Sequence, residues 1–304
     1  MDKKDNASKK SFHPIAWIRR HVRTAVQLAF TALTNGYIQG FLGKKLYKGD
    51  LKQFCLPGLN CYSCPGALGS CPIGAMQAVS TDRKHSFSFY VAGILMMLGA
   101  IVGRFVCGFL CPFGLVQDLL YKIPVPKVLR RIPGDRFLRY LKYLVLLALV
   151  LILPDRATNV IGQGDPWFCK YLCPSGTLMG GIPQVLSTPA LQSAIGFLFG
   201  WKMGILVLIL LLSTVNYRPF CKYLCPLGAI YGLCNPISLY HLEVDKEKCV
   251  HCGLCSKKCG MGVDVPHAPN SPECIRCGLC AKVCPHDALH FGFVHSKKKQ
   301  PPRP

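Results

Sequence analysis

Apolar residues are concentrated in four stretches, separated by polar segments that are rich in glycine, proline and cysteine. The stretches run from about residue 24 to 43, from 87 to 106, from 143 to 153, and from 203 to 217 with a lead-in over 194–201. A bilayer core of about 30 Å takes about 20 apolar residues in a helix. The pattern therefore predicts an α-helical integral membrane protein with about four transmembrane helices.

Two of the four stretches fit a membrane span less well. The third is short and ends at Pro154, so it reaches spanning length only if Arg139 and Lys142 extend their charged ends to the interface. Buried core helices of a soluble protein are the alternative for such lengths. The first stretch carries four polar residues, namely Gln27, Thr31, Asn35 and Gln39.

Composition agrees with a membrane protein that has a polar appendage. Hydrophobic residues make up 51% of the 304 residues and charged residues 16%, which disfavours a disordered chain and a purely soluble enzyme. There are 36 Lys and Arg against 14 Asp and Glu, a net charge of +22. These basic residues flank the apolar stretches, as the positive-inside rule expects, and do not form a nucleic-acid-binding module.

Charge also predicts the orientation. With a cytoplasmic N-terminus, the segments 1–23, 112–142 and 218–304 lie inside and hold most of the Lys and Arg, whereas 44–86 and 154–193 lie outside. We expect a multi-pass protein of the cytoplasmic (inner) membrane with both termini cytoplasmic. Its predicted parts are a basic N-terminus (1–23), a four-span membrane domain (24–241), a cysteine-rich C-terminal domain (242–292) and a basic tail (293–304).

The C-terminal domain carries the pattern C-x2-C-x2-C-x3-C twice, and this is the most specific signal in the chain. Zinc sites more often use two separated C-x2-C pairs, whereas a 4Fe-4S cluster takes three thiolates from one tight loop and a fourth from elsewhere. Residues 243–292 resemble the bacterial two-cluster ferredoxin, a small α+β fold. That resemblance implies that Cys249, Cys252, Cys255 and Cys284 hold one cluster, and Cys274, Cys277, Cys280 and Cys259 the other. Gly260 stands where that family usually has proline.

Other cysteines form a second repeat, C-x3-C-P-x-G. The three copies are Cys107/Cys111, Cys169/Cys173 and Cys221/Cys225, and Cys71 begins a partial fourth copy after Cys55, Cys61 and Cys64. Proline after the second cysteine suits the first turn of a helix, so the thiolates are expected at helix N-termini, where the dipole favours negative charge. Arg104, Lys170, Arg218 and Lys222 are expected to add to this effect. The alternative is that the motif only marks helix starts.

Each C-x3-C pair supplies two ligands, so the pairs must combine. Cys107, Cys111, Cys221 and Cys225 follow spans that end on the cytoplasmic side, and we expect them to form one 4Fe-4S site. An outer site takes Cys169 and Cys173 with two of the four cysteines at 55, 61, 64 and 71, or those four alone. Disulfides among these six are the alternative, because that compartment tolerates them. Cys234 has no assigned role.

The chain from about Arg19 onward resembles the NapH/NosR group of membrane polyferredoxins, through its spans, its C-x3-C-P motifs and its C-terminal ferredoxin. The resemblance implies an electron-transfer subunit of an oxidoreductase system, relaying electrons between cytoplasmic ferredoxin clusters and an extracytoplasmic acceptor. Its partners would be the lipid bilayer and redox proteins on one or both sides, with a flavoprotein or reductase as candidates. The alternatives are a NapH-type quinol dehydrogenase, which adds a quinone, and a NosR-type redox-sensing or maturation protein. The sequence offers no catalytic triad or paired carboxylate.

Overall fold

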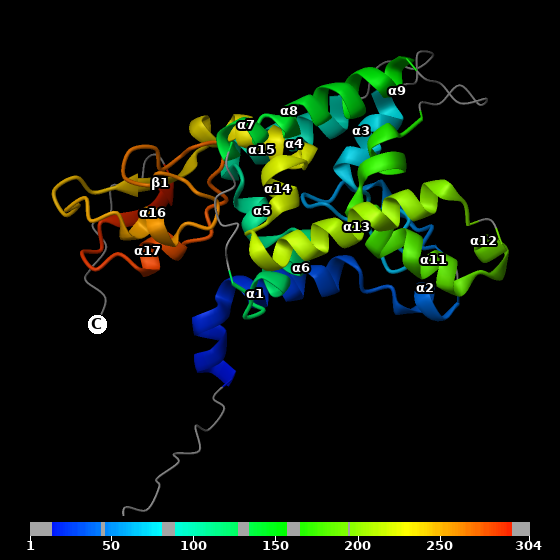
Figure 1. The fold of residues 1–304 in the computed structure, drawn as a ribbon, viewed down its shortest axis with the longest axis horizontal. Helices are drawn as coiled ribbons and strands as arrows, with labels where there is room; N and C mark the ends of the chain where they lie inside the picture. Colours follow the sequence, from blue (N-terminus) through cyan, green and yellow to red (C-terminus); the bar gives the residue numbers. More distant parts are fainter. Residues whose placement is uncertain are drawn as a thin grey trace, which may run out of the picture.

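The computed structural model describes residues 14–43, 46–80, 89–126, 134–156, 165–193 and 195–293. The protein is mostly helical, with one two-stranded sheet near the C-terminus (Figure 1). The predicted basic tail, most of the basic N-terminus and the basic loop at 127–133 lie outside the described residues.

The helices fall into a membrane-domain set and a short C-terminal set. The first set is α1 (Pro14–Thr34), α2 (Ile38–Leu42), α3 (Pro72–Ser80), α4 (Phe89–Val102), α5 (Phe105–Phe109), α6 (Pro112–Tyr121), α7 (Asp135–Leu138), α8 (Leu141–Val145), α9 (Leu153–Arg156), α10 (Pro174–Gly176), α11 (Ile182–Ser187), α12 (Pro189–Ser193), α13 (Phe197–Val215), α14 (Pro219–Tyr223) and α15 (Pro226–Cys234). Wide π turns occupy Leu146–Ile152, Phe168–Leu172 and Thr177–Gly181, and 3-10 turns occupy Asp50–Gln53 and Asn235–Ile237.

Two helices of the described chain are long and apolar enough to cross a membrane, Asp135–Arg156 and Phe197–Val215. They correspond to the third and fourth predicted spans. The second predicted span is the shorter apolar helix α4. The first is interrupted, because α1 ends at Thr34 and a turn separates it from α2. The predicted helical fold is thus confirmed, with two candidate membrane-spanning helices among the described residues, and the number of four spans stays a prediction.

The third span reaches its length in a way that differs from our expectation. Lys142 does not extend toward an interface, because its side chain is fully buried and forms an ion pair with Glu273. Arg139 pairs with Asp135 one turn earlier in the helix. Carboxylates of the protein itself, a buried one in the case of Lys142, therefore neutralise the charges that the sequence alone would send to the surface.

The apolar helices carry their large hydrophobic side chains outward. On α13, Phe197, Trp201 and Leu211 are at least half exposed, and Leu144 and Leu147 are similarly exposed on the long helix 135–156. Several long charged side chains, by contrast, are fully buried, which is rare in water-soluble proteins unless they are paired. Such a distribution suits hydrocarbon surroundings around an interior that contains polar groups.

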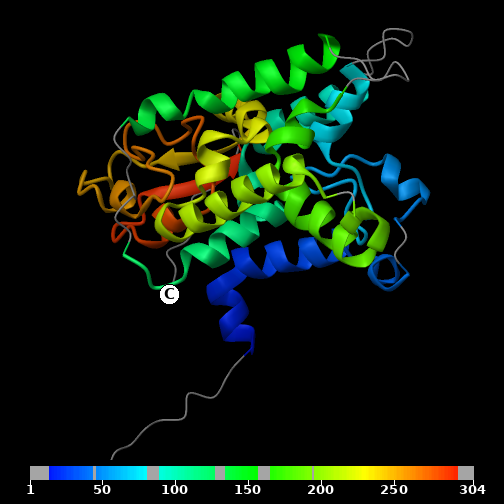
Figure 2. The same cartoon turned by 45° about the vertical axis from the view of Figure 1, so that its right-hand side comes forward.

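The C-terminal segment lies at one end of the long axis of the molecule (Figure 1). Strands β1 (Tyr240–Val244) and β2 (Leu289–Phe293) pair antiparallel, with Leu242 opposite Phe291, and helices α16 (Leu254–Lys258) and α17 (Leu279–Lys282) complete a small α+β unit. Figure 2 shows the helix 135–156 along one side of the molecule and α1 along the opposite side, with α13 and α6 between them. The cysteine motifs lie inside this frame.

Candidate iron-sulfur sites

The eight cysteines of the C-terminal segment form the two groups that the ferredoxin resemblance implied. Each group of four lines a small cavity of about 20 Å³. The first contains Cys249, Cys252, Cys255 and Cys284, and the second contains Cys259, Cys274, Cys277 and Cys280. Positive backbone φ at Gly253 and Gly278 lets each loop turn sharply between successive cysteines.

Gly260, the departure from the family pattern, has a local explanation in its contact with Tyr217. A side-chain carbon at residue 260 would lie 2.5 Å from the Tyr217 ring. The Tyr217 side chain also lines the cavity of the second ferredoxin group and accepts a hydrogen bond from Arg23. The aromatic ring therefore occupies the space that a proline ring at residue 260 would need.

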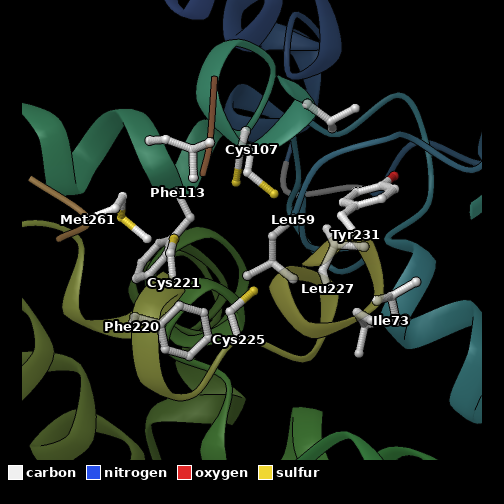
Figure 3. Packing of buried hydrophobic residues seen from close by; sticks show 14 of the residues in the cluster. Leu59, Ile73, Cys107, Phe113, Phe220, Cys221, Cys225, Leu227, Tyr231 and Met261 are labelled. Carbon is white, nitrogen blue, oxygen red and sulfur yellow. The ribbon is translucent and has the colours of Figure 1, made fainter. Parts of the chain in front are cut away.

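The cysteines of the first and third C-x3-C-P motifs meet in the centre of the molecule. Cys107, Cys111, Cys221 and Cys225 are all buried and lie close enough to act on one another electrostatically. Figure 3 shows the sulfurs of Cys107, Cys221 and Cys225 pointing into one space, with the Leu59 side chain beside them. We call these four cysteines the inner group.

Every motif begins a helix at its proline, as the sequence predicted. Helices α3, α6, α10 and α15 start at Pro72, Pro112, Pro174 and Pro226. At α10 and α15 the preceding cysteine caps the helix, because the Gly176 and Gly228 amides donate to the sulfurs of Cys173 and Cys225 at 3.2 and 3.3 Å. A sulfur that carries negative charge is stabilised by these amides and by the helix dipole.

Two arginines connect the first and third motifs reciprocally, and each lies three residues before the first cysteine of its own motif. Arg104 donates to the carbonyl oxygen of Cys221 at 3.2 Å, and Arg218 donates to that of Cys107. Each guanidinium also packs against the glycine of the opposite motif, Arg104 on Gly228 and Arg218 on Gly114. Because a side chain at either glycine would meet the guanidinium within about 3 Å, the glycine of C-P-x-G makes room for this exchange.

Carboxylates outside the motifs compensate the buried arginines. Asp118 accepts from Arg218 and pairs with Arg23, and these cations hold the pKa of Asp118 at about 2 against the opposing effect of burial. Glu273 of the ferredoxin segment pairs with Arg104 at 3.1 Å and with Lys142. Lys170 and Lys222, which we expected beside the thiolates, pair with Asp165 and Asp135 instead.

Four outer cysteines surround a much larger cavity, of about 690 Å³. Cys61, Cys71, Cys169 and Cys173 line it together with Asn60 and Lys202, and their thiols act on one another electrostatically. We call these four the outer group. Of the two combinations that the sequence left open, this geometry favours Cys169 and Cys173 with two N-proximal cysteines, here Cys61 and Cys71.

The remaining cysteines do not line this cavity. Cys64 is buried next to Lys52, Cys55 lies in the loop that pairs with Ser70, and Cys234 packs against Gly99 in the core. All nineteen cysteines are described, and none forms a disulfide.

A short segment joins the inner and outer groups. The backbone at Gly58 packs against Cys111, because an added carbon at Gly58 would lie 3.1 Å from the Cys111 Cα, whereas Cys61, three residues later, belongs to the outer group. Three residues span at most about 11 Å, so the two groups are close neighbours inside the protein. The backbone of Ile275 packs on Gly108, which brings the second ferredoxin group next to the inner group.

The thiol geometry suits a group larger than a single ion. Within the described residues, no three His, Cys, Asp or Glu side chains close on a position that could hold one metal ion. Zinc would need its sulfurs about 2.3 Å from a common centre. Burial also raises the pKa of Cys169 and Cys221 to about 11, so these thiols ionise at neutral pH only when a metal binds them. Groups of four thiols, several of them buried beside N–H donors, fit 4Fe-4S clusters.

Comparison with known proteins points to the same chemistry. A family model described as a 4Fe-4S binding domain matches residues 85–133, 164–188 and 198–238, and a second with the same description matches 270–290. An uncharacterised protein of Methanocaldococcus jannaschii is 30% identical over 208 residues, 67% of this chain and 79% of that protein. The ferredoxin-type protein NapH of Haemophilus influenzae is 28% identical over 78% of this chain and 73% of its own length.

The methylamine utilization ferredoxin-type protein MauN of Paracoccus denitrificans is 30% identical over 52% of this chain and 48% of its own length. The chain thus spans only about half of some curated relatives that it matches. No solved structure matches the chain.

Proposed function

Because the chain belongs to the family of ferredoxin-type 4Fe-4S proteins, the polyferredoxins, we propose that it is a membrane-bound electron-transfer protein. It relays electrons between its ferredoxin segment, on the cytoplasmic side, and an acceptor at the opposite end. Its partners are the bilayer and a redox protein on each side, with a flavoprotein or reductase as candidates.

The observation that carries this proposal is the order of the four thiol groups. The second ferredoxin group adjoins the inner group through Ile275 and Gly108, and the inner group adjoins the outer group through the segment from Gly58 to Cys61. Neighbouring groups are thus linked by packed backbone, with no gap as wide as a bilayer core. The sequence alone left that gap open, because it placed the motifs at opposite ends of the spans.

The bound clusters would supply one-electron exchange, and the protein supplies everything else. Sixteen cysteines, in four groups of four, hold the iron. Motif amides together with Arg104 and Arg218 offset the negative charge of the thiolates. Burial of the inner group keeps water away from it.

The exposed apolar faces of α13 and of the helix 135–156 support placement in a bilayer. If those faces lie in lipid, the long axis of the molecule runs across the membrane and the ferredoxin segment projects on one side. The excess of Lys and Arg in the inside segments makes that side cytoplasmic.

Liposomes test this function. The purified protein is reconstituted with an electron acceptor trapped inside, and dithionite is added outside in the absence of quinone. We expect sustained reduction of the trapped acceptor, and none with the variant Cys169→Ala/Cys173→Ala, which keeps the ferredoxin and inner groups. A wild-type protein with about sixteen irons per chain that still passes no electrons would contradict the proposal.

A quinol dehydrogenase is the second candidate, and the size of the outer cavity favours it. At about 690 Å³ it is far larger than the cavities of about 20 Å³ in the ferredoxin segment, so it has room for a further molecule beside the outer thiols. In liposomes this function would require added quinone. A redox-sensing or maturation role, the third possibility, predicts no sustained flux at all.

A further inference from the structure

Two buried glutamines occupy equivalent positions in the two halves of the membrane domain. Gln77 and Gln117 each stand six residues after the cysteine that precedes the helix-starting proline, in the strings Cys71-Pro-Ile-Gly-Ala-Met-Gln and Cys111-Pro-Phe-Gly-Leu-Val-Gln. Neither side chain has any exposed surface. A fully buried amide needs partners for its polar atoms, so the environment of each glutamine is informative.

Both glutamines donate to a sulfur of the opposite motif. The Nε2 atom of Gln77 lies 3.2 Å from the sulfur of Cys169, and that of Gln117 lies 3.1 Å from the sulfur of Cys221. The same two nitrogens also donate to the carbonyl oxygens of Ile73 and Phe113, one turn back in their own helices. Both neighbours of each nitrogen are acceptors, so the N–H₂ end of each amide must face the sulfur.

The two target cysteines are themselves equivalent, because each is the first cysteine of a Phe-Cys-Lys-Tyr-Leu-Cys-Pro string. One glutamine therefore serves the outer group and the other serves the inner group. They differ in one respect. The Oε1 atom of Gln77 accepts from the Phe168 amide at 3.0 Å, whereas the Oε1 atom of Gln117 has no partner among the described residues.

On the basis of the proposed function, we propose that Gln77 and Gln117 are positioning residues that set the reduction potentials of the outer and inner iron-sulfur sites. Reduction adds negative charge that spreads over the sulfurs, and an N–H group pointing at a sulfur stabilises that charge. Each glutamine thus raises the potential of its own site. Gln77, held at both ends of its amide, keeps its donor fixed more rigidly than Gln117 does.

The test replaces each amide by an apolar side chain of similar volume, Gln77→Met and Gln117→Met. A hydrogen bond to a charged group contributes about 1.5 kcal/mol or more, so its loss should lower the reduced-to-oxidised ratio of that site about tenfold at a fixed ambient potential. For a one-electron couple this equals about 59 mV toward negative values. Redox titrations followed by electron paramagnetic resonance on the intact protein measure this shift.

The decisive outcome is whether each variant shifts the reduction potential of one site only. Gln77→Met should move one spectral component, Gln117→Met should move a different one, and the ferredoxin components should stay in place in both. Gln192→Met, the same change at an exposed glutamine away from the thiols, is the control and should move nothing.

Iron content distinguishes a failure of this inference from a failure of the proposed function. A wild-type protein with only about eight irons would refute the membrane-domain sites themselves. Full iron with unshifted potentials in both variants would overturn the role of the glutamines alone. If a Met variant loses iron, the isosteric variant Gln77→Glu or Gln117→Glu replaces it. Loss of iron in that variant too would show a structural role for the glutamine and would also overturn the inference.

Discussion

Asp118 is the carboxylate that neutralises Arg218, beside the inner group, and Arg23 of α1. Arg218 is fully buried and approaches the Cys107 carbonyl while Asp118 neutralises it, and Arg23 reaches the same carboxylate from α1. Removing one partner of a buried ion pair leaves an uncompensated charge, which costs about 3–5 kcal/mol.

We therefore expect Asp118→Asn to lower the thermal unfolding midpoint in detergent by roughly 10 °C. Differential scanning fluorimetry or circular dichroism measures this midpoint. Asp245→Asn, at a more exposed carboxylate of the ferredoxin segment, is the control and should change little. An unchanged midpoint in Asp118→Asn would mean that Arg218 finds enough compensation elsewhere.

Gly260 gives a second prediction at this scale, because restoring the common family residue should be harmful. Gly260→Pro forces a ring into the Tyr217 side chain, and overpacking of this kind costs about 1–3 kcal/mol. The unfolding midpoint of the ferredoxin segment, followed by loss of its visible absorbance on heating, should fall. Gly292→Ala, where an added carbon meets nothing within 4 Å, should have no such effect.

Individual residues also mark the limit of prediction from sequence. The helix starts at Pro112 and Pro226 could be predicted, because the effect of proline on the first turn of a helix is local. The exchange of Arg104 and Arg218 between motifs could not, since it depends on how two segments more than a hundred residues apart pack. The same holds for Gln117, whose spacing within its own motif gives no hint of a contact with Cys221.

At the scale of elements, the iron content of cysteine variants tests which motifs share one site. If the first and third motifs share one site, Cys107→Ala/Cys111→Ala and Cys221→Ala/Cys225→Ala should each lose about four irons per chain, and so should the combination of all four changes. Two separate sites would instead lose about eight in the combination. Iron and acid-labile sulfide analysis of the purified proteins measures both quantities.

The outer group has a matched pair of controls. Cys64→Ser and Cys55→Ser lie close in sequence to Cys61 but do not line the outer cavity, so both should keep full iron. Loss of iron in either one would contradict the assignment of Cys61 and Cys71. The sequence left this choice open because spacing in an irregular loop does not show which cysteines face a distant motif.

Glu273 joins two elements of the membrane domain to the ferredoxin segment. It pairs with Arg104 at the start of α5 and with Lys142 on α8, and both cations are fully buried. Glu273→Gln leaves them without a charged partner, so the ferredoxin segment should dock less firmly. We expect faster hydrogen exchange in β1 and faster proteolysis of residues 240–293, with Glu243→Gln, an exposed carboxylate, as the unchanged control.

The helix α1 shows that mean hydropathy alone can underestimate how well a helix suits an apolar environment. Its polar Gln27 weakened the prediction of a first span, yet Gln27 is buried and donates to Asp118. The outward residues Val22, Leu28 and Leu33 are apolar. Gln27 thus finds its partner inside the protein, and an average over the helix hides this separation of polar and apolar faces.

At the scale of the whole molecule, burial and charge give one consistent arrangement. The apolar surface lies around the long helices, and the ferredoxin segment projects beyond them at one end (Figure 1). The four thiol groups follow one another from that end toward the outer cavity. The C-terminal groups could be expected from the resemblance to the two-cluster ferredoxin. The short link between the inner and outer groups required the tertiary structure, because it runs through Leu59 and Asn60, which belong to no motif.

This arrangement makes a final prediction about membrane topology. Residues 189–193 lie at the end of the molecule away from the ferredoxin segment, so a reporter placed after Ser193 and one placed after Pro304 should lie in opposite compartments. Alkaline phosphatase, active only outside the cytoplasm, should be active after Ser193 and inactive after Pro304. Green fluorescent protein should show the reverse. Both reporters reporting one compartment would place the inner and outer groups on the same side, and the chain would then be an anchored ferredoxin with no path across the bilayer.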